Sequence, residues 1–208
     1  MKKKVILTST NPSEYPDLVV ECKVIPNGEI CDYIANIPEK SKFNAYKSTP
    51  VQARVGKLGE KVVSVLKTIV DGREYILTEE TGTVKEEEIK TSHGVEKRVG
   101  FVVKNINSTS DEEYVVKPST FARTYELDKE TMTYIPVYDS RKFAQVDENI
   151  MFETAWGTWV ICLKGSYIVT YDASTNDYNA VEKDAFRKTY TKEETKKLTI
   201  NNKDSQKN

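Results

Sequence analysis

The chain has 208 residues, of which 38% are apolar and 30% charged, so it has room for one large domain or two small ones. Lys and Arg number 31 against 32 Asp and Glu, and the formal charge of −1 leaves no cationic surplus for neutralising nucleic-acid phosphates. No apolar run approaches 18 residues, which excludes a membrane-spanning helix. The apolar run in Met1–Thr8 is too short for a signal peptide, so a cytosolic setting with reduced thiols is expected for the three cysteines.

Residues 1–50 are predicted to form an N-terminal β-hairpin region. Asn27-Gly28 lies between two β-prone runs and is the preferred two-residue hairpin turn, because both positions accept a positive φ. With these residues at the tip, Cys22 and Cys31 lie diagonally on one face, which favours two packed thiols over a disulfide. The polar stretch 37–50 contains two prolines and is interpreted as a connector.

Residues 51–130 are predicted to form a first β module. The β-branched run Val62–Val70 indicates a strand, and Asp71-Gly72 is a second hairpin turn. The charged segment 83–91 is expected to be a solvated edge strand or hairpin arm, with Ser92-His93-Gly94 as its tip.

Residues 131–192 are predicted to form a second β module, and residues 193–208 a loose polar tail. The stretches 134–138 and 149–154 are additional strand candidates. Thr191 to Glu194 has capping-box spacing, typical of a final helical turn. We therefore expect a mainly β protein, α+β at the margin, with two or three short helices, at Phe121, at Phe186 and near the end.

A pattern occurs twice, in residues 100–126 and 157–191. When Phe101 is aligned with Tyr167 and Asp111 is skipped, Phe121 meets Phe186, and Thr124-Tyr125 meets Thr189-Tyr190. Two β runs joined by a polar turn and followed by Phe-x-x-Thr-Tyr form one supersecondary unit. Such a unit cannot bury its apolar face alone, so the copies are expected to pack on each other or on the N-terminal segment. Chance similarity is the alternative, since Val, Thr and Tyr are common in strands.

These motifs resemble small tailed-phage and prophage proteins of the PGDYG-like kind. The shared features are the Gly165–Val169 hairpin, the Lys117-Pro118 strand end and the closing Phe-x-x-Thr-Tyr of each copy. Ser166 stands where that family has Asp, and Gly100 is followed directly by an aromatic residue. The resemblance covers about half of the chain and implies a phage-borne accessory protein in the host cytoplasm or the virion. It implies no activity that can be carried over to particular residues.

The sequence lacks the patterns of several common chemistries. The sole histidine, His93, lies in a charged loop rather than between a nucleophile and an acid. Cysteine and histidine spacings do not match a zinc site, and no phosphate-binding glycine loop is present. Gly56-Lys-Leu-Gly59 matches the loop with which KH domains clamp RNA, but such a loop must join two helices, and here a predicted strand follows it. We expect no cofactor.

Aromatic side chains are the most suggestive candidates for binding. Trp156, beside Gly157, is predicted to be an exposed interface anchor, whereas Trp159 is expected to be packed in the core. Arg123 and Lys188 occupy equivalent positions beside the Thr-Tyr pairs and are candidates for a repeated anion site. The full set of predicted binding residues is Trp156, Tyr167, Arg123, Tyr125, Lys188 and Tyr190.

These observations favour a non-enzymatic phage accessory protein that binds another protein, as a virion component or an inhibitor of a host defence system. The first alternative is a module that binds a nucleic acid or nucleotide through Gly56–Gly59 or through Arg123 and Lys188. The second alternative is an enzyme that acts through carboxylates and a metal ion. A phage structural or host protein is the expected partner, no membrane is involved, and self-association stays open.

Overall fold

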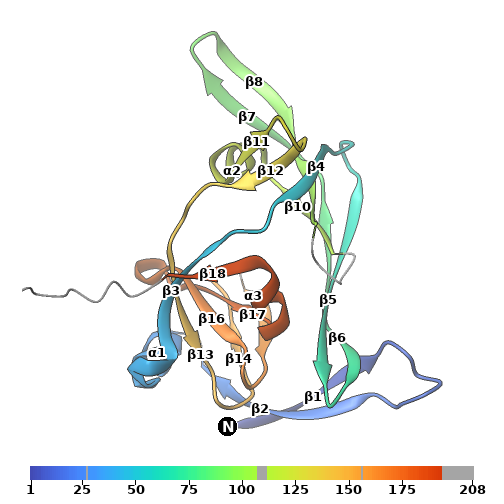
Figure 1. Ribbon diagram of the computed structural model, residues 1–208, viewed down its shortest axis with the longest axis vertical. Coiled ribbons are helices and arrows are strands. Elements are labelled where there is room, and N and C mark those ends of the chain that lie inside the picture. Colours follow the sequence, from blue (N-terminus) through green and yellow to red (C-terminus); the bar gives the residue numbers. More distant parts are fainter. Residues whose placement is uncertain (27, 107–111, 156, 194–208) are drawn as a thin grey trace, which may run out of the picture.

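The computed structural model describes residues 1–26, 28–106, 112–155 and 157–193, and this part of the chain is mainly β, as predicted (Figure 1). Its strands form one six-stranded sheet, two five-stranded sheets and one two-stranded hairpin. No helix in the described ranges is long and apolar enough to cross a membrane.

Each five-stranded sheet contains one copy of the predicted repeat. In the first copy the elements are β9 (Phe101–Asn105), β10 (Glu113–Val116), α2 (Pro118–Thr124) and β11 (Tyr125–Asp128). In the second they are β16 (Tyr167–Asp172), β17 (Asp177–Val181), α3 (Lys183–Thr189) and β18 (Tyr190–Lys192). Phe101 pairs with Val116 as Tyr167 pairs with Val181, so the strand register agrees with the sequence alignment of the two copies.

Two further strands extend the correspondence. In the order of the chain, β3 (Lys42–Lys47) and β4 (Val51–Val55) precede the first copy, and β12 (Thr133–Pro136) and β13 (Arg141–Gln145) precede the second. The sheets have the orders β10-β9-β4-β12-β11 and β17-β16-β13-β3-β18. Each sheet therefore holds the first strand of the other repeat, and the two repeats exchange β3 and β12.

The exchange requires two connections that run between the sheets, and Figure 1 shows them side by side, in cyan and yellow. Equivalent backbone hydrogen bonds fix both connections: Ser48 N–H donates to the Thr189 carbonyl (2.9 Å), and Val137 N–H donates to the Thr124 carbonyl (2.8 Å). The sheets thus do not follow the predicted divisions at residues 50 and 130. Residues 42–47, interpreted as a connector, are a strand of the second sheet because they pair with β13 and β18.

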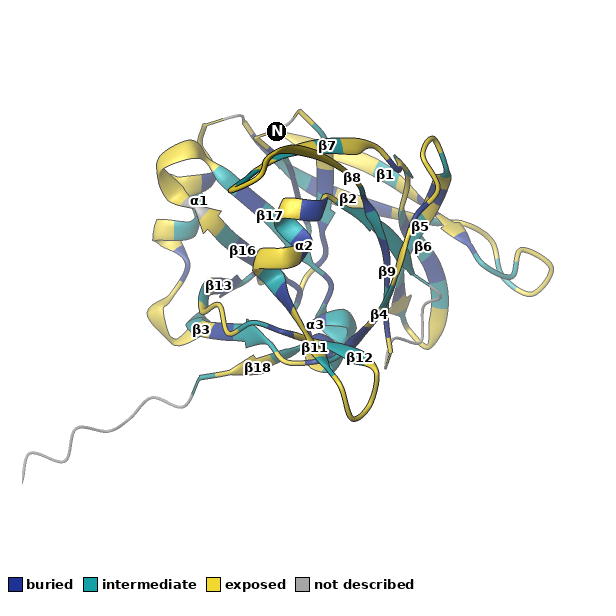
Figure 2. Ribbon diagram, turned by 90° about the horizontal axis from the view of Figure 1, so that it is seen from above, coloured by how far each residue is buried: buried dark blue, intermediate teal, exposed yellow. Residues whose placement is uncertain are grey.

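The six-stranded sheet joins the two repeats a second time. It has the order β15-β14-β2-β1-β6-β5. Its strands are β1 (Lys2–Ser9), β2 (Leu18–Ile25), β5 (Lys61–Val70), β6 (Arg73–Thr83), β14 (Ile150–Glu153) and β15 (Trp159–Cys162). The β5–β6 and β14–β15 hairpins are inserted in the first and second repeat respectively, and the N-terminal β1–β2 hairpin bridges them. Seen from above, the strands surround the centre of the molecule (Figure 2).

The described turns agree with the sequence at two hairpins. Asp71 (φ 51°) and Gly72 (φ 76°) join β5 to β6, as expected for a turn that needs positive φ at both positions. Residues 92 and 93 lie between β7 (Glu86–Thr91) and β8 (Gly94–Val99), at the tip of the predicted charged arm.

The predicted hairpin turn at residues 27 and 28 is wrong. Ile30–Asn36 forms α1, and β2 pairs with β1 instead of with residues 31–33. Ile30, Tyr33, Ile34 and Ile37 have helical spacing and pack in one core, which outweighs the local Asn-Gly signal. Consequently Cys22 is buried in a strand, whereas Cys31 is exposed on a helix.

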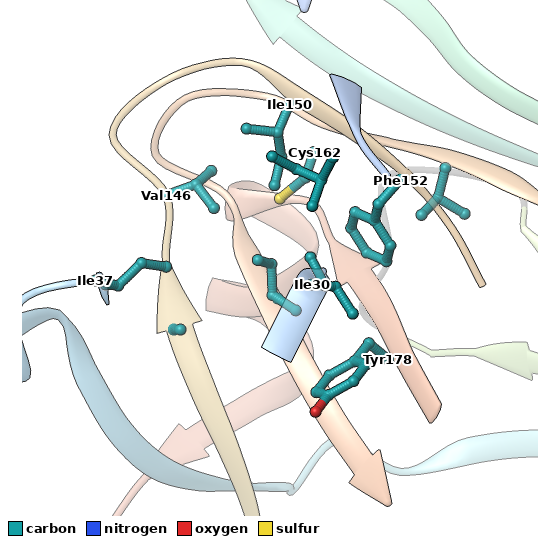
Figure 3. Close-up of a cluster of buried hydrophobic side chains, with 11 residues drawn as sticks. Ile30, Ile37, Val146, Ile150, Phe152, Cys162 and Tyr178 are labelled. Atoms are coloured by element: carbon teal, nitrogen blue, oxygen red, sulfur yellow. The ribbon is translucent and has the colours of Figure 1, made fainter. Parts of the chain in front are cut away.

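The largest core lies between α1, the β14–β15 hairpin and the second five-stranded sheet (Figure 3). Side chains from all three converge there, including Ile30, Val146, Ile150, Phe152 and Tyr178. Cys162 is buried among them, and burial raises the pKa of its thiol. The thiol is therefore a packing group in this core.

The two predicted helices of the repeats exist, and each begins with a recognisable signal. In α2, Pro118 occupies the first turn, where its missing N–H costs nothing. In α3, the Glu182 carboxylate caps the helix by accepting hydrogen bonds from the N–H groups of Asp184 (2.6 Å) and Ala185 (3.0 Å). The predicted final helical turn is wrong at its start, because Thr191 and Lys192 are in β18. Residues 194–208 lie outside the described residues.

Candidate functional site

A cavity of about 400 Å³ lies where the two five-stranded sheets and β5 meet. Its wall includes Tyr125 and Tyr190, the equivalent tyrosines of the two repeats. The site thus arises from the strand exchange, since each sheet turns one Phe-x-x-Thr-Tyr segment toward it. Two of the six predicted binding residues are therefore brought together.

Lys47 connects the two sheets across this cavity. The residue belongs to β3 in the second sheet, and its ammonium donates hydrogen bonds to the hydroxyls of Tyr114 (2.9 Å) and Tyr125 (3.1 Å) in the first. Those hydroxyl oxygens lie 3.0 Å apart. Burial raises the pKa of Tyr114, so its hydroxyl stays protonated and neutral at pH 7. Both rings also lie within 5.5 Å of the ammonium, an arrangement that favours a cation.

Arg141 supplies a second positive charge to the cavity wall. Its guanidinium stacks 4.3 Å from the centroid of the Tyr171 ring and forms a salt bridge with Asp139 (2.5 Å). Because this guanidinium has both an aromatic and an acidic partner, its charge is already compensated within the protein.

Two carboxyl groups of the wall are also hydrogen-bonded. Glu182 caps α3 and accepts a hydrogen bond from the Thr68 hydroxyl of β5 (3.1 Å). Glu112 accepts one from the Ser64 hydroxyl (3.2 Å), and burial raises the pKa of this carboxyl. These contacts tie β5 to both repeats around the cavity.

Unlike these carboxyl groups, the side-chain amide of Asn105 has an oxygen that lacks a hydrogen-bond donor among the described residues. Its side chain is only 8% exposed and lines the cavity, and its Oδ1 atom accepts no hydrogen bond from any described residue. A buried carbonyl oxygen without a donor costs free energy, so groups of this kind are normally satisfied by protein, water or ligand.

The other predicted residues lie elsewhere. Tyr167 is buried in the core of the second sheet, packed against Phe186 with 4.3 Å between ring centroids. Arg123 is exposed on α2, and Lys188 is half-buried on α3 beside β5. Neither cation is part of the cavity wall that contains Tyr125 and Tyr190. Trp156 lies outside the described residues.

Trp159 is 46% exposed, which corrects the expectation that it is a core residue. Trp159 lies on β15, which is the edge strand of the six-stranded sheet. Because nothing pairs beyond an edge strand, a large side chain there stays half in solvent.

The Gly56–Gly59 loop joins β4 to β5, and therefore does not have the two flanking helices of a KH loop. Glu60 closes it by accepting hydrogen bonds from the Arg54 guanidinium and from Lys57 N–H (2.8 Å), which lower the pKa of this carboxyl to about 2. Residues 56–59 therefore form a turn between two strands. Within the described ranges, no three His, Cys, Asp or Glu side chains are grouped as ligands of a metal ion.

Sequence reasoning missed Lys47, Asn105, Tyr114 and Arg141. The repeat alignment identified Tyr125 and Tyr190 because their motif is local. Lys47 gave no comparable signal, since its position opposite Tyr114 depends on which sheet β3 joins. No protein-family model, curated protein or solved structure matches this chain.

Proposed function

We propose that the chain is a non-enzymatic binding protein that holds a partner protein through its β7–β8 arm, as a phage accessory protein. The supporting observation is the arm itself. It forms a two-stranded sheet apart from the other three, and projects from the molecule beside α2 (Figure 1). The resemblance of the repeat motifs to small tailed-phage proteins supports the phage setting, with a role in the virion or against a host defence system.

The arm offers one accessible edge. At its base, Ser119 on α2 donates hydrogen bonds from its N–H (2.8 Å) and hydroxyl (2.7 Å) to the Glu87 carboxylate of β7. α2 thus lies against β7, whereas β8 has its main contacts with β7 alone. The outer edge of β8 therefore presents backbone N–H and C=O groups that an extended segment of another protein can pair with.

The side chains of β8 indicate which segment fits. Val95 (61% exposed) and Lys97 lie two residues apart and so on the same face of the arm. Apolar pairs and opposite charges stabilise neighbouring strands, whereas like charges destabilise them. We infer that the partner contributes an extended segment in which an apolar and an acidic residue alternate with other residues.

The test is a double substitution on the arm, Val95→Asp with Lys97→Glu. Partner captured by the immobilised wild-type protein from lysate of infected cells should bind this variant about tenfold more weakly or worse. The matched control is Met132→Asp with Lys129→Glu, which makes the same change of charge in the exposed turn between β11 and β12. Met132 has a φ of 54°, which Asp tolerates. Equal binding by the arm variant and the wild type would contradict the proposal.

A further inference from the structure

Beyond partner binding, we infer that the central cavity is a binding site for a small molecule that carries an anionic group and an N–H or O–H donor. The anion would be a carboxylate or a phosphate, placed at the hydroxyls of Tyr114 and Tyr125 and the ammonium of Lys47. The donor would be placed at Oδ1 of Asn105.

The hydrogen-bond capacity of the Lys47 cluster supports the anionic half. An ammonium has three N–H donors, and Lys47 uses two of them on the tyrosine hydroxyls. The two hydroxyls share one hydrogen bond, so one of their two O–H protons is unused. Within the described part of the chain, one N–H and one O–H donor thus lack an acceptor at a single point.

The charge balance around Lys47 supports the same assignment. No described carboxylate forms a salt bridge with its ammonium within 4.0 Å. Asp139 is paired with Arg141, Glu182 caps α3, and Glu112, which interacts electrostatically with Lys47 from the same wall, accepts a hydrogen bond from Ser64. The Tyr114 hydroxyl beside Lys47 does not neutralise it, because burial raises the pKa of that hydroxyl and keeps it uncharged. A partly buried charge that has no carboxylate in direct contact is stabilised by a counter-ion.

Asn105 is the second, independent observation. Its Oδ1 is a buried acceptor in the same cavity and needs a donor that no described protein group supplies. A cavity of about 400 Å³ falls within the range of roughly 300–1,000 Å³ that ligand sites occupy. The acceptor on Asn105 and the donors of the Lys47 cluster together favour a compact molecule that carries both an anionic group and an N–H or O–H donor. An α-amino acid and a nucleoside monophosphate are molecules of this kind.

Isothermal titration calorimetry of the full chain at low ionic strength tests whether the ligand is a carboxylate of an amino acid or a phosphate of a nucleotide. One arm uses the twenty α-amino acids, and the other uses the four common nucleoside monophosphates. Binding by members of one arm is expected. Lys47→Met and Asn105→Leu should each weaken that binding about tenfold or more, because each removes a hydrogen-bonding group at the site.

The controls are Lys129→Met in the turn between β11 and β12 and Asn36→Leu on α1, which make the same chemical changes at exposed positions. Both should bind like the wild type. The inference is overturned if neither set of molecules binds the wild-type chain, or if the cavity variants bind as tightly as the controls. Circular dichroism of each variant guards against a fold defect, and either cavity variant alone suffices for the comparison.

Discussion

Phe186→Ala is expected to lower the free energy of unfolding by about 3–5 kcal/mol, the cost of removing a buried aromatic side chain. Phe186 is 3% exposed, and its ring lies 4.3–5.6 Å, between centroids, from those of Phe43, Phe143, Tyr167 and Tyr190. Phe43 belongs to the exchanged strand β3, so this substitution loosens the contact between the two repeats as well as the second sheet.

Urea unfolding followed by circular dichroism measures the effect. Phe186→Leu is the control, because it keeps most of the apolar volume and should cost less than about 1.5 kcal/mol. If the alanine and leucine variants were equally stable, Phe186 would not be the packing centre of the second sheet.

The second large effect is expected in the N-terminal hairpin. Leu7→Ala should destabilise the protein by about 2–5 kcal/mol, because Leu7 is 1% exposed in the core of the six-stranded sheet. This core contains residues of β1, β2 and β6 as well as Met151 of β14. Its loss therefore weakens the bridge between the insertions of the two repeats.

The adjacent residue provides a matched control on the same strand. Ile6 points to the other face of β1 and is 64% exposed, so Ile6→Ala should change stability by less than about 0.5 kcal/mol. Thermal unfolding of both variants checks the contrast. Similar melting temperatures for Leu7→Ala and Ile6→Ala would show that β1 does not pack as described.

The features that the sequence predicted correctly are short-range. The Asp71-Gly72 turn is determined by the backbone preferences of two neighbouring residues. The helices at Phe121 and Phe186 follow from repeated motifs whose start signals, Pro118 and Glu182, lie within a few positions. The mainly β fold class could also be predicted from the sequence, because β-branched and aromatic residues recur in short alternating runs.

The features that could not be predicted depend on which strands pair over long distances. Residues 42–47 and 133–136 can form strands in either five-stranded sheet, since nothing in their own pattern distinguishes the two. Their exchange is decided by packing, for example of Phe43 on Phe143, whose stacked rings lie 5.9 Å apart between centroids. The cavity depends on which sheet β3 and β12 join, and the positions of Lys47 and Arg141 in its wall depend on the same pairing.

The wrong prediction at helix α1 has a different cause, because it concerns a local signal and not long-range strand pairing. The prediction rested on Asn27-Gly28 as a hairpin turn, whereas Ile30, Tyr33, Ile34 and Ile37 have helical spacing and pack in one core. A turn signal is meaningful only when both flanking runs need strand partners, and here β1 already pairs with β2. The helical spacing of the apolar side chains, and not the turn signal, agrees with how this segment packs in the core.

The exchange of β3 and β12 is the claim on which the cavity and its ligand depend, and an engineered disulfide tests it most directly. The hydroxyls of Ser48, just after β3, and Thr191 on β18 lie 2.7 Å apart, so cysteines at both positions are close enough to bond. Ser48→Cys with Thr191→Cys, made in a Cys31→Ser background to remove the exposed native thiol, should form an intramolecular 48–191 disulfide under mild oxidation. Peptide mass mapping without reductant would identify that bond. If both cysteines instead stayed free to react with an alkylating reagent in the folded chain, β3 would not lie in the second sheet, and the exchange would be refuted.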